Sequence, residues 1–128
     1  LLADGIRKRL CGRARPGDVA DFGGSQDFTL PLIPADQCQS NCSFVSGEGA
    51  AATALAISFA LIAPAVRQRV SPTFFRLFIA IAVLAPLTGM ALRVILGRHF
   101  LYDTIFAALI VSGVALVLAR LLLIRPAK

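Results

Sequence analysis

The stretch best suited to chemistry is a short polar one between two apolar runs, and it holds Arg93, His99 and Asp103. His99 is the only histidine of the 128-residue chain. It stands four residues before Asp103, so on a helix the two side chains would lie on one face. A carboxylate in that position can fix the tautomer of an imidazole and stabilise the imidazolium, as in a catalytic triad. The spacing therefore makes His99 a candidate catalytic residue and Asp103 its partner.

Two further polar stretches carry groups that bind anions. Lys8 and Arg15 are seven residues apart, about two helical turns, so both bases could project from one face of a helix. Ser46 and Gly47 precede a long apolar run and would lie at the N-terminus of its helix, where backbone N–H groups form an anion site. Glu48 follows them and would favour the positive end of the helix dipole.

The elements that must position these residues are apolar helices. Hydrophobic residues make up 57% of the chain, above the roughly 45–50% of a soluble domain. Apolar runs cover 50–66, 77–92 and 104–124, and a transmembrane helix needs about 20 residues. Ser71 and Pro72 resemble an N-cap followed by proline at the first helical position. The pattern predicts three membrane-spanning helices.

Charge distribution predicts how these helices are oriented. Two spans separate residues 1–48 from 93–103, so both polar regions should face the same side. The opposite side holds six bases and no acid: Arg67, Arg69, Arg76, Arg120, Arg125 and Lys128. Short basic loops are typical of the cytoplasmic side, which leaves the polar regions facing the periplasm or exterior.

The region 17–48 shows no apolar period and is expected to be a long loop. Loops of this length are usually functional or disordered. Cys38 and Cys42 within it could form a disulfide in an oxidising compartment or remain two free thiols. A zinc site is not expected, because the only histidine is elsewhere and two more ligands are lacking.

Together the three polar stretches resemble the signature of the type 2 phosphatidic acid phosphatase superfamily, whose active sites are similar to those of vanadium haloperoxidases. Its first motif, Lys-x6-Arg-Pro, is matched in full at residues 8–16. Its third, Ser-Arg-x5-His-x3-Asp, is matched at Arg93, His99 and Asp103, with Leu92 in place of serine. The resemblance covers essentially the whole chain.

The second motif, Pro-Ser-Gly-His, departs from the family at two positions. Val45 stands for the proline and Glu48 stands for the histidine. The stretch from Asn41 to Glu48 is most similar to bacterial branches that include lipid A phosphatases.

The resemblance implies an all-α membrane protein containing the last three transmembrane helices of a six-helix phosphatase bundle, preceded by a long active-site loop. Residues 1–48 would carry the first phosphate-binding motif and the extramembrane loop, and residues 49–128 the helices with the His/Asp motif. The two regions would form one domain. The chain begins with Leu1 rather than Met, which favours an N-terminally truncated piece.

The family mechanism, carried over by position, makes His99 the nucleophile of a phosphohistidine intermediate and Asp103 the group that orients it. Glu48 replaces a general acid; protonated it could keep that role, and ionised it would orient His99 or pair with an arginine. The acid role is the one we expect. The substrate phosphate would be bound by Lys8, Arg15, Ser46, Gly47 and Arg93. Cations then take the place of magnesium, so no metal and no cofactor is expected.

The function that follows is hydrolysis of a lipid phosphate, either lipid A, a glycerolipid phosphate or a polyprenyl diphosphate. Its partners would be the lipid substrate and the bilayer, with no nucleic acid. The expected location is the bacterial inner membrane, with the active site facing the periplasm. The alternative is an impaired protein that binds lipid phosphate without turnover, which Glu48 keeps open. Four remaining bases could attract an anionic headgroup or do nothing specific: Arg7, Arg9, Arg13 and Arg98.

Overall fold

The computed structural model describes residues 12–40 and 42–123. Three long helices follow a polar segment: α2 (Gly47–Arg67), α3 (Pro72–Ile95) and α4 (Leu101–Leu123). Two short 3-10 helices, η1 (Pro16–Asp18) and η2 (Ala20–Phe22), lie in the polar segment. Within the described ranges, the only pairing of extended backbone is an isolated bridge between Val19 and Gln26. The expected all-α fold is therefore confirmed.

The helices begin where local sequence favours a helix start. Ser46 caps α2, because its hydroxyl oxygen accepts the N–H of Gly49 at 2.9 Å. Ser71 caps α3, and Pro72 occupies the first turn, where a missing N–H costs nothing. Both helices contain an internal proline, Pro64 and Pro86. Membrane helices tolerate such prolines, because neighbouring groups satisfy the freed carbonyls.

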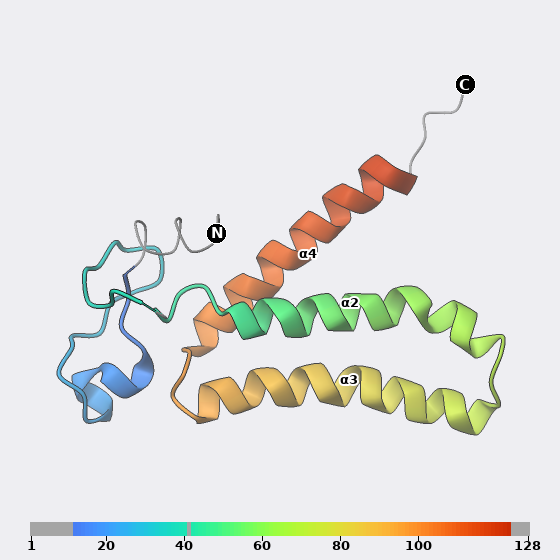
Figure 1. Ribbon diagram of the computed structural model, residues 1–128, viewed down its shortest axis with the longest axis horizontal. Helices are drawn as coiled ribbons and strands as arrows, with labels where there is room; N and C mark the ends of the chain where they lie inside the picture. The colour runs from blue at the N-terminus through green and yellow to red at the C-terminus, as the bar shows by residue number, and fades with distance from the viewer. Residues whose placement is uncertain (1–11, 41, 124–128) are drawn as a thin grey trace.

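All three helices are long and apolar enough to cross a membrane: Gly47–Arg67, Pro72–Ile95 and Leu101–Leu122. Helices α2 and α3 run antiparallel side by side, and α4 packs against α2 near its start and then diverges (Figure 1). Few of their residues are buried within the chain, and large apolar side chains are exposed along each helix. Such surfaces fit a bilayer or further helices rather than water.

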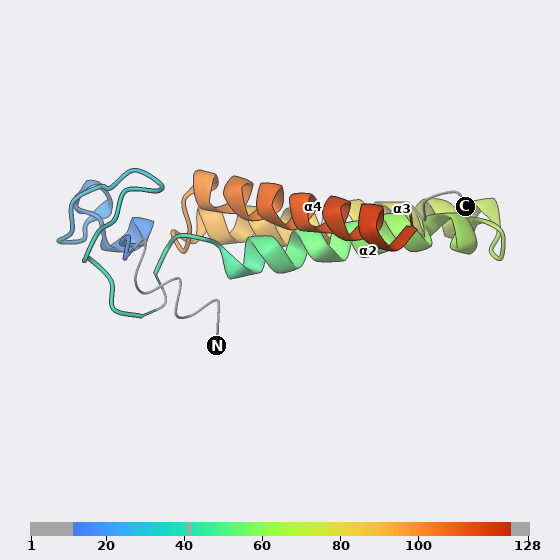
Figure 2. The same ribbon diagram turned by 90° about the horizontal axis from the view of Figure 1, so that it is seen from above.

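The polar segment 12–46 lies at the end of the bundle where α2 begins, α3 ends and α4 begins (Figures 1 and 2). The side chain of Gln37 links two stretches of this segment. Its amide oxygen accepts from Thr29 Oγ1 at 2.9 Å, and its amide nitrogen donates to the carbonyl of Asp27 at 2.8 Å. Gly17 N–H donates to the carbonyl of Gly97 at 3.2 Å and joins the segment to the turn after α3. The two polar regions therefore share one side, as their parity predicted.

One local expectation was wrong. His99 and Asp103 do not lie on one helical face, because α4 begins at Leu101 and His99 precedes it in a bend. The Asp103 carboxylate reaches back to the N–H of Phe100 at 3.1 Å, and the N–H of Asp103 donates to the Phe100 carbonyl at 3.0 Å. These two bonds cap the first turn of α4, so the helix starts after Phe100 and does not include His99.

Candidate functional site

His99 occupies a buried position between the polar segment and the start of α2. Its side chain is only 2% exposed. Its Nδ1 lies 2.7 Å from the carbonyl oxygen of Ser43, and its Nε2 lies 3.0 Å from Oε2 of Glu48. A carbonyl oxygen only accepts, so Nδ1 carries a proton and donates it to Ser43. Nε2 is then the nitrogen whose lone pair can become available for attack.

Glu48 brings the second and third motifs together from the first turn of α2. One carboxylate oxygen meets His99, and the other lies 3.7 Å from Nε of Arg93, near the end of α3. Side chains of Glu48 and Arg93 are 45% and 42% exposed. The Nε2 side of His99 therefore opens towards an accessible acid and an accessible cation.

Asp103 is fully buried and its contacts differ from the expected one. One carboxylate oxygen lies 2.6 Å from Nη1 of Arg13, and the other accepts from the Ser43 hydroxyl and the Phe100 N–H. None of the hydrogen bonds described for Asp103 goes to His99. Ser43 stands between them, since its hydroxyl binds Asp103 and its carbonyl accepts from His99.

Arg13 and Ser43 are two site residues to which the sequence pointed weakly or not at all. Arg13 was indistinguishable from other bases near the membrane surface, yet it is 1% exposed and pairs with Asp103. Ser43 is 0% exposed, and no spacing rule singled it out. The only available signal was that an acid in the first turn of a membrane helix needs a polar or charged partner.

The residues proposed for phosphate binding that the structure describes lie at the same end of the bundle (Figure 1): Arg15, Ser46, Gly47 and Arg93. Ser46 is buried, and its hydroxyl oxygen is already used to cap α2. Gly47 is exposed at the N-terminus of that 21-residue helix, where the dipole favours an anion. Arg15 is half-buried in extended backbone just before η1, so the helical spacing to Lys8 does not continue through it. Lys8 lies outside the described residues.

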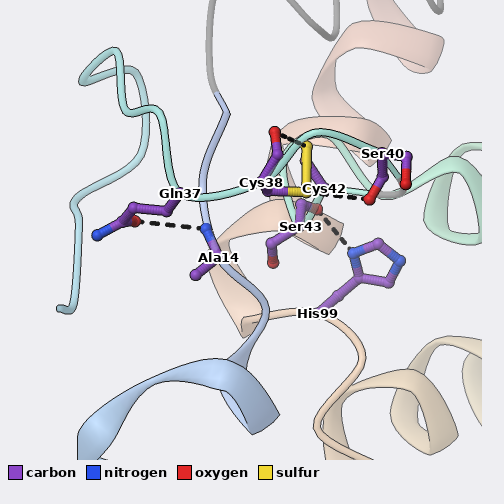
Figure 3. Close-up of a disulfide and its surroundings, with 7 residues drawn as sticks. All are labelled: Ala14, Gln37, Cys38, Ser40, Cys42, Ser43 and His99. Atoms are coloured by element: carbon purple, nitrogen blue, oxygen red, sulfur yellow. Dashed lines mark hydrogen bonds between the residues drawn. A yellow bond between two sulfur atoms is a disulfide. The ribbon is translucent and has the colours of Figure 1, made fainter. Parts of the chain in front are cut away.

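The Cys38–Cys42 disulfide is formed, with 5.5 Å between the two Cα atoms, within the usual range. Of the two alternatives that the sequence left open, the disulfide is therefore the one present. Figure 3 shows it directly before Ser43, with the dashed bond from Ser43 to the ring of His99. The disulfide thus closes a short loop directly before Ser43, whose carbonyl oxygen accepts the hydrogen bond from the imidazole of His99.

A metal site was not expected from the residue types. Among residues 12–40 and 42–123, no group of three or more His, Cys, Asp and Glu side chains could hold a metal ion. Among the described residues, Arg13 and Arg93 bring positive charge to the site.

Comparison with known proteins agrees with the motifs. The chain is 37% identical over 103 residues to a lipid A 4'-phosphatase of Rhizobium etli, covering 80% of this chain and 37% of that protein. It is 35% identical over 105 residues to a protein of the same name from Rhizobium leguminosarum, and the match covers 82% of this chain and 42% of that protein. A third, from Francisella tularensis subsp. novicida, is 32% identical over 111 residues, covering 87% and 47%.

The chain spans less than half the length of each of these curated relatives. No solved structure matches it. The family model described as the PAP2 superfamily matches residues 1–126, which include all three motifs and all three helices. By its motifs, its apolar helices and this match, the chain is an integral membrane protein that belongs to the PAP2 superfamily.

Proposed function

We propose that this chain is the catalytic part of a membrane-bound phosphatase that removes a phosphate group from lipid A. The observation that carries the proposal is the orientation of His99. Its Nδ1 donates to the Ser43 carbonyl, while Nε2 lies against the half-exposed Glu48, whose other carboxylate oxygen lies 3.7 Å from Nε of Arg93. The names of the curated relatives support lipid A as the first substrate to test.

Phosphate binding would rest on charge and on the α2 N-terminus. Arg93, Arg15 and Lys8 supply cations for the phosphate oxygens, and Gly47 supplies a backbone N–H where the helix dipole favours an anion. Glu48 now lies against Arg93 and His99. An incoming phosphate would compete with Glu48 for Arg93, so binding would free the Glu48 side chain from the arginine.

Glu48 and His99 share a single proton in the resting site. Nε2 and a carboxylate oxygen 3.0 Å apart would place two lone pairs against each other unless one atom is protonated. With the proton on Glu48, the Nε2 lone pair is free and Glu48 is a general acid. This is how a glutamate can take the place of the family histidine.

The first step would form the Nε2–P bond and break the bond from phosphorus to the lipid oxygen. Glu48 would give its proton to that oxygen, so the lipid leaves as an alcohol. Glu48 would then act as a base and take a proton from water as the water oxygen attacks phosphorus, and the Nε2–P bond breaks with its electron pair returning to the imidazole. Phosphate leaves, and the proton is back on Glu48 for the next turn.

The second candidate function is lipid phosphate binding without turnover. The same Glu48 contacts favour it, because an ionised Glu48 paired with Arg93 would leave His99 protonated and unable to attack.

The disulfide supports placing the site on the periplasmic side of the inner membrane, since disulfides persist in oxidising compartments.

The test is phosphate release by the full-length protein from lipid A, a glycerolipid phosphate and a polyprenyl diphosphate, each with and without EDTA. We expect release from lipid A that EDTA does not reduce. Stoichiometric binding of lipid A with no phosphate release would favour the second candidate. Loss of activity in EDTA, restored by a divalent metal, would contradict the metal-independent mechanism.

A further inference from the structure

Arg13 and Asp103 form a charged pair that is almost completely buried, and the catalytic steps above use neither residue directly. Burying a charge is costly unless it is paired and hydrogen-bonded. Both side chains are almost completely buried, at 1% and 0% exposed, and their atoms approach to 2.6 Å. A buried ion pair is often no more stable than an apolar packing, so stability alone is a poor reason for it.

Arg13 is held in one orientation by three kinds of contact. Its Nε donates to the carbonyl of Thr29 at 2.6 Å, and its Nη1 faces Asp103. Its guanidinium lies 3.9 Å from the ring centroid of Phe100 and 5.3 Å from that of Phe28. A planar guanidinium fixed in this way presents its charge to Asp103 with little freedom to rotate.

Both members of the pair hold Ser43. Asp103 accepts from the Ser43 hydroxyl, and the backbone carbonyl of Arg13 accepts the Ser43 N–H at 3.0 Å. The carbonyl of Ser43 is then directed at Nδ1 of His99, 2.7 Å away. An unbroken chain of contacts therefore runs from Arg13 through Asp103 and Ser43 to the imidazole.

We propose that Arg13 is a positioning residue that acts through Asp103 and Ser43 to keep the proton of neutral His99 on Nδ1. The inference rests on the proposed function only for its effect on turnover. Without Arg13, Asp103 would turn towards other donors, and the Ser43 carbonyl would no longer be fixed. Neutral His99 could then carry its proton on Nε2, and that tautomer has no lone pair with which to attack phosphorus.

The kinetic test compares Arg13→Gln and Arg13→Lys with Arg69→Gln in the full-length protein. Arg69 is an exposed arginine in the turn at the opposite end of the bundle, so it is a matched control for loss of one charge. We expect Arg13→Gln to lower kcat by about 10- to 100-fold, by analogy with the cost of losing a group that orients a metal-binding histidine. KM should change little, because the Arg13 side chain is almost completely buried and its Nη1 faces Asp103.

Arg13→Lys should recover part of kcat, because lysine keeps a positive charge beside Asp103. Recovery should be incomplete, because lysine lacks the planar guanidinium that fixes the orientation of the contact. Arg69→Gln should retain the parent kcat. A rise in KM with unchanged kcat in Arg13→Gln would place Arg13 in phosphate binding and overturn the proposal.

The second readout needs no turnover. Protein labelled with ¹⁵N-histidine would report the tautomer of His99, identified as the signal lost in His99→Ala. At a pH where the imidazole is neutral, we expect a protonated Nδ1 in the parent and in Arg69→Gln. Arg13→Gln should show a mixture with the Nε2-protonated form.

An unchanged Nδ1-protonated signal in folded Arg13→Gln would overturn the proposal. If Arg13→Gln does not fold, Ser43→Ala replaces it, since it removes the hydroxyl bond to Asp103 and keeps the backbone carbonyl. Retention of the parent tautomer in Ser43→Ala would equally overturn it. A parent without phosphatase activity, in which the variant still shifts the tautomer, would contradict the proposed function and leave the positioning role intact.

Discussion

The three helices and the polar segment 12–46 reverse the usual distribution of residues between inside and outside. Along the helices, large apolar side chains such as Leu116 and Leu121 are exposed, at 66% and 73%. At the junction of the polar segment with the helix ends, the buried side chains include arginine, aspartate, histidine and serine. In a soluble domain the apolar residues would be the buried ones.

The difference follows from what surrounds each region. Lipid or neighbouring helices are as apolar as leucine, so the helices gain nothing by hiding their side chains from that environment. The site lies where the helices end, and its buried polar atoms must find partners within the protein. The site is therefore organised by specific hydrogen bonds and by the buried Arg13–Asp103 ion pair rather than by an apolar core.

The strongest expected effect tests whether this polar junction is where the chemistry takes place. His99→Ala should reduce phosphate release by about 1,000-fold or more, because it removes the attacking nitrogen. The protein should remain in the membrane, since no helix is altered. Phosphate release with membrane fractions quantified by immunoblotting would measure both. Activity within a few-fold of the parent would contradict the nucleophile assignment.

The next effect separates orientation from attack. Asp103→Asn should reduce kcat less than His99→Ala does, because the attacking nitrogen remains. It should also destabilise the fold, since breaking a buried ion pair costs about 3–5 kcal/mol. Thermal unfolding in detergent, followed beside kcat, would measure the two effects. An unfolding midpoint equal to that of the parent would show that the Arg13–Asp103 pair contributes little to stability.

A third prediction concerns the accessible side of the imidazole. Glu48→Ala should lose most activity on a lipid monoester, and Glu48→His should retain measurable activity, because histidine can also donate a proton. On a lipid diphosphate the loss in Glu48→Ala should be smaller, since the leaving phosphate is a weaker base than an alkoxide. Equal losses for both variants on the monoester would argue against the acid role, and full activity of Glu48→Ala would exclude it.

The smallest expected effect concerns the crosslink next to the site. Replacing Cys38 and Cys42 together by serine should lower activity by only a few-fold, because Ser43 keeps its bonds to Asp103 and to the carbonyl of Arg13. The matched control is Cys11→Ser, because Cys11 is the third cysteine of the chain and is not part of the Cys38–Cys42 disulfide. Loss of activity comparable to that of His99→Ala would mean that the crosslink, rather than the ion pair, holds the imidazole.

The sequence was informative where the signal is local or belongs to a motif. Three apolar runs predicted three helices, Ser71 and Pro72 predicted the start of one, and helix parity predicted that Glu48 and His99 share a side. The start of α4 was missed, because a capping bond between Phe100 and Asp103 decided it against the four-residue spacing.

The rest of the site could not be predicted, because it depends on contacts between residues far apart in the chain. Arg13 and Asp103 are separated by 90 positions, and Ser43 and His99 by 56. No periodicity connects such residues, and the charge of Arg13 looked like that of any base near a membrane surface. Only the folding of the polar segment over the helix ends brings them together.

The placement of the site at the helix ends also separates the two products of the proposed reaction. Inorganic phosphate would dissolve in the aqueous phase, while the dephosphorylated lipid would stay anchored by its acyl chains and diffuse laterally in the bilayer. The two would rarely meet again at one enzyme, so re-esterification would be negligible even where the lipid accumulates. Hydrolysis of a phosphate ester is already favourable in water, and departure of the two products into different phases would keep the reverse reaction slow.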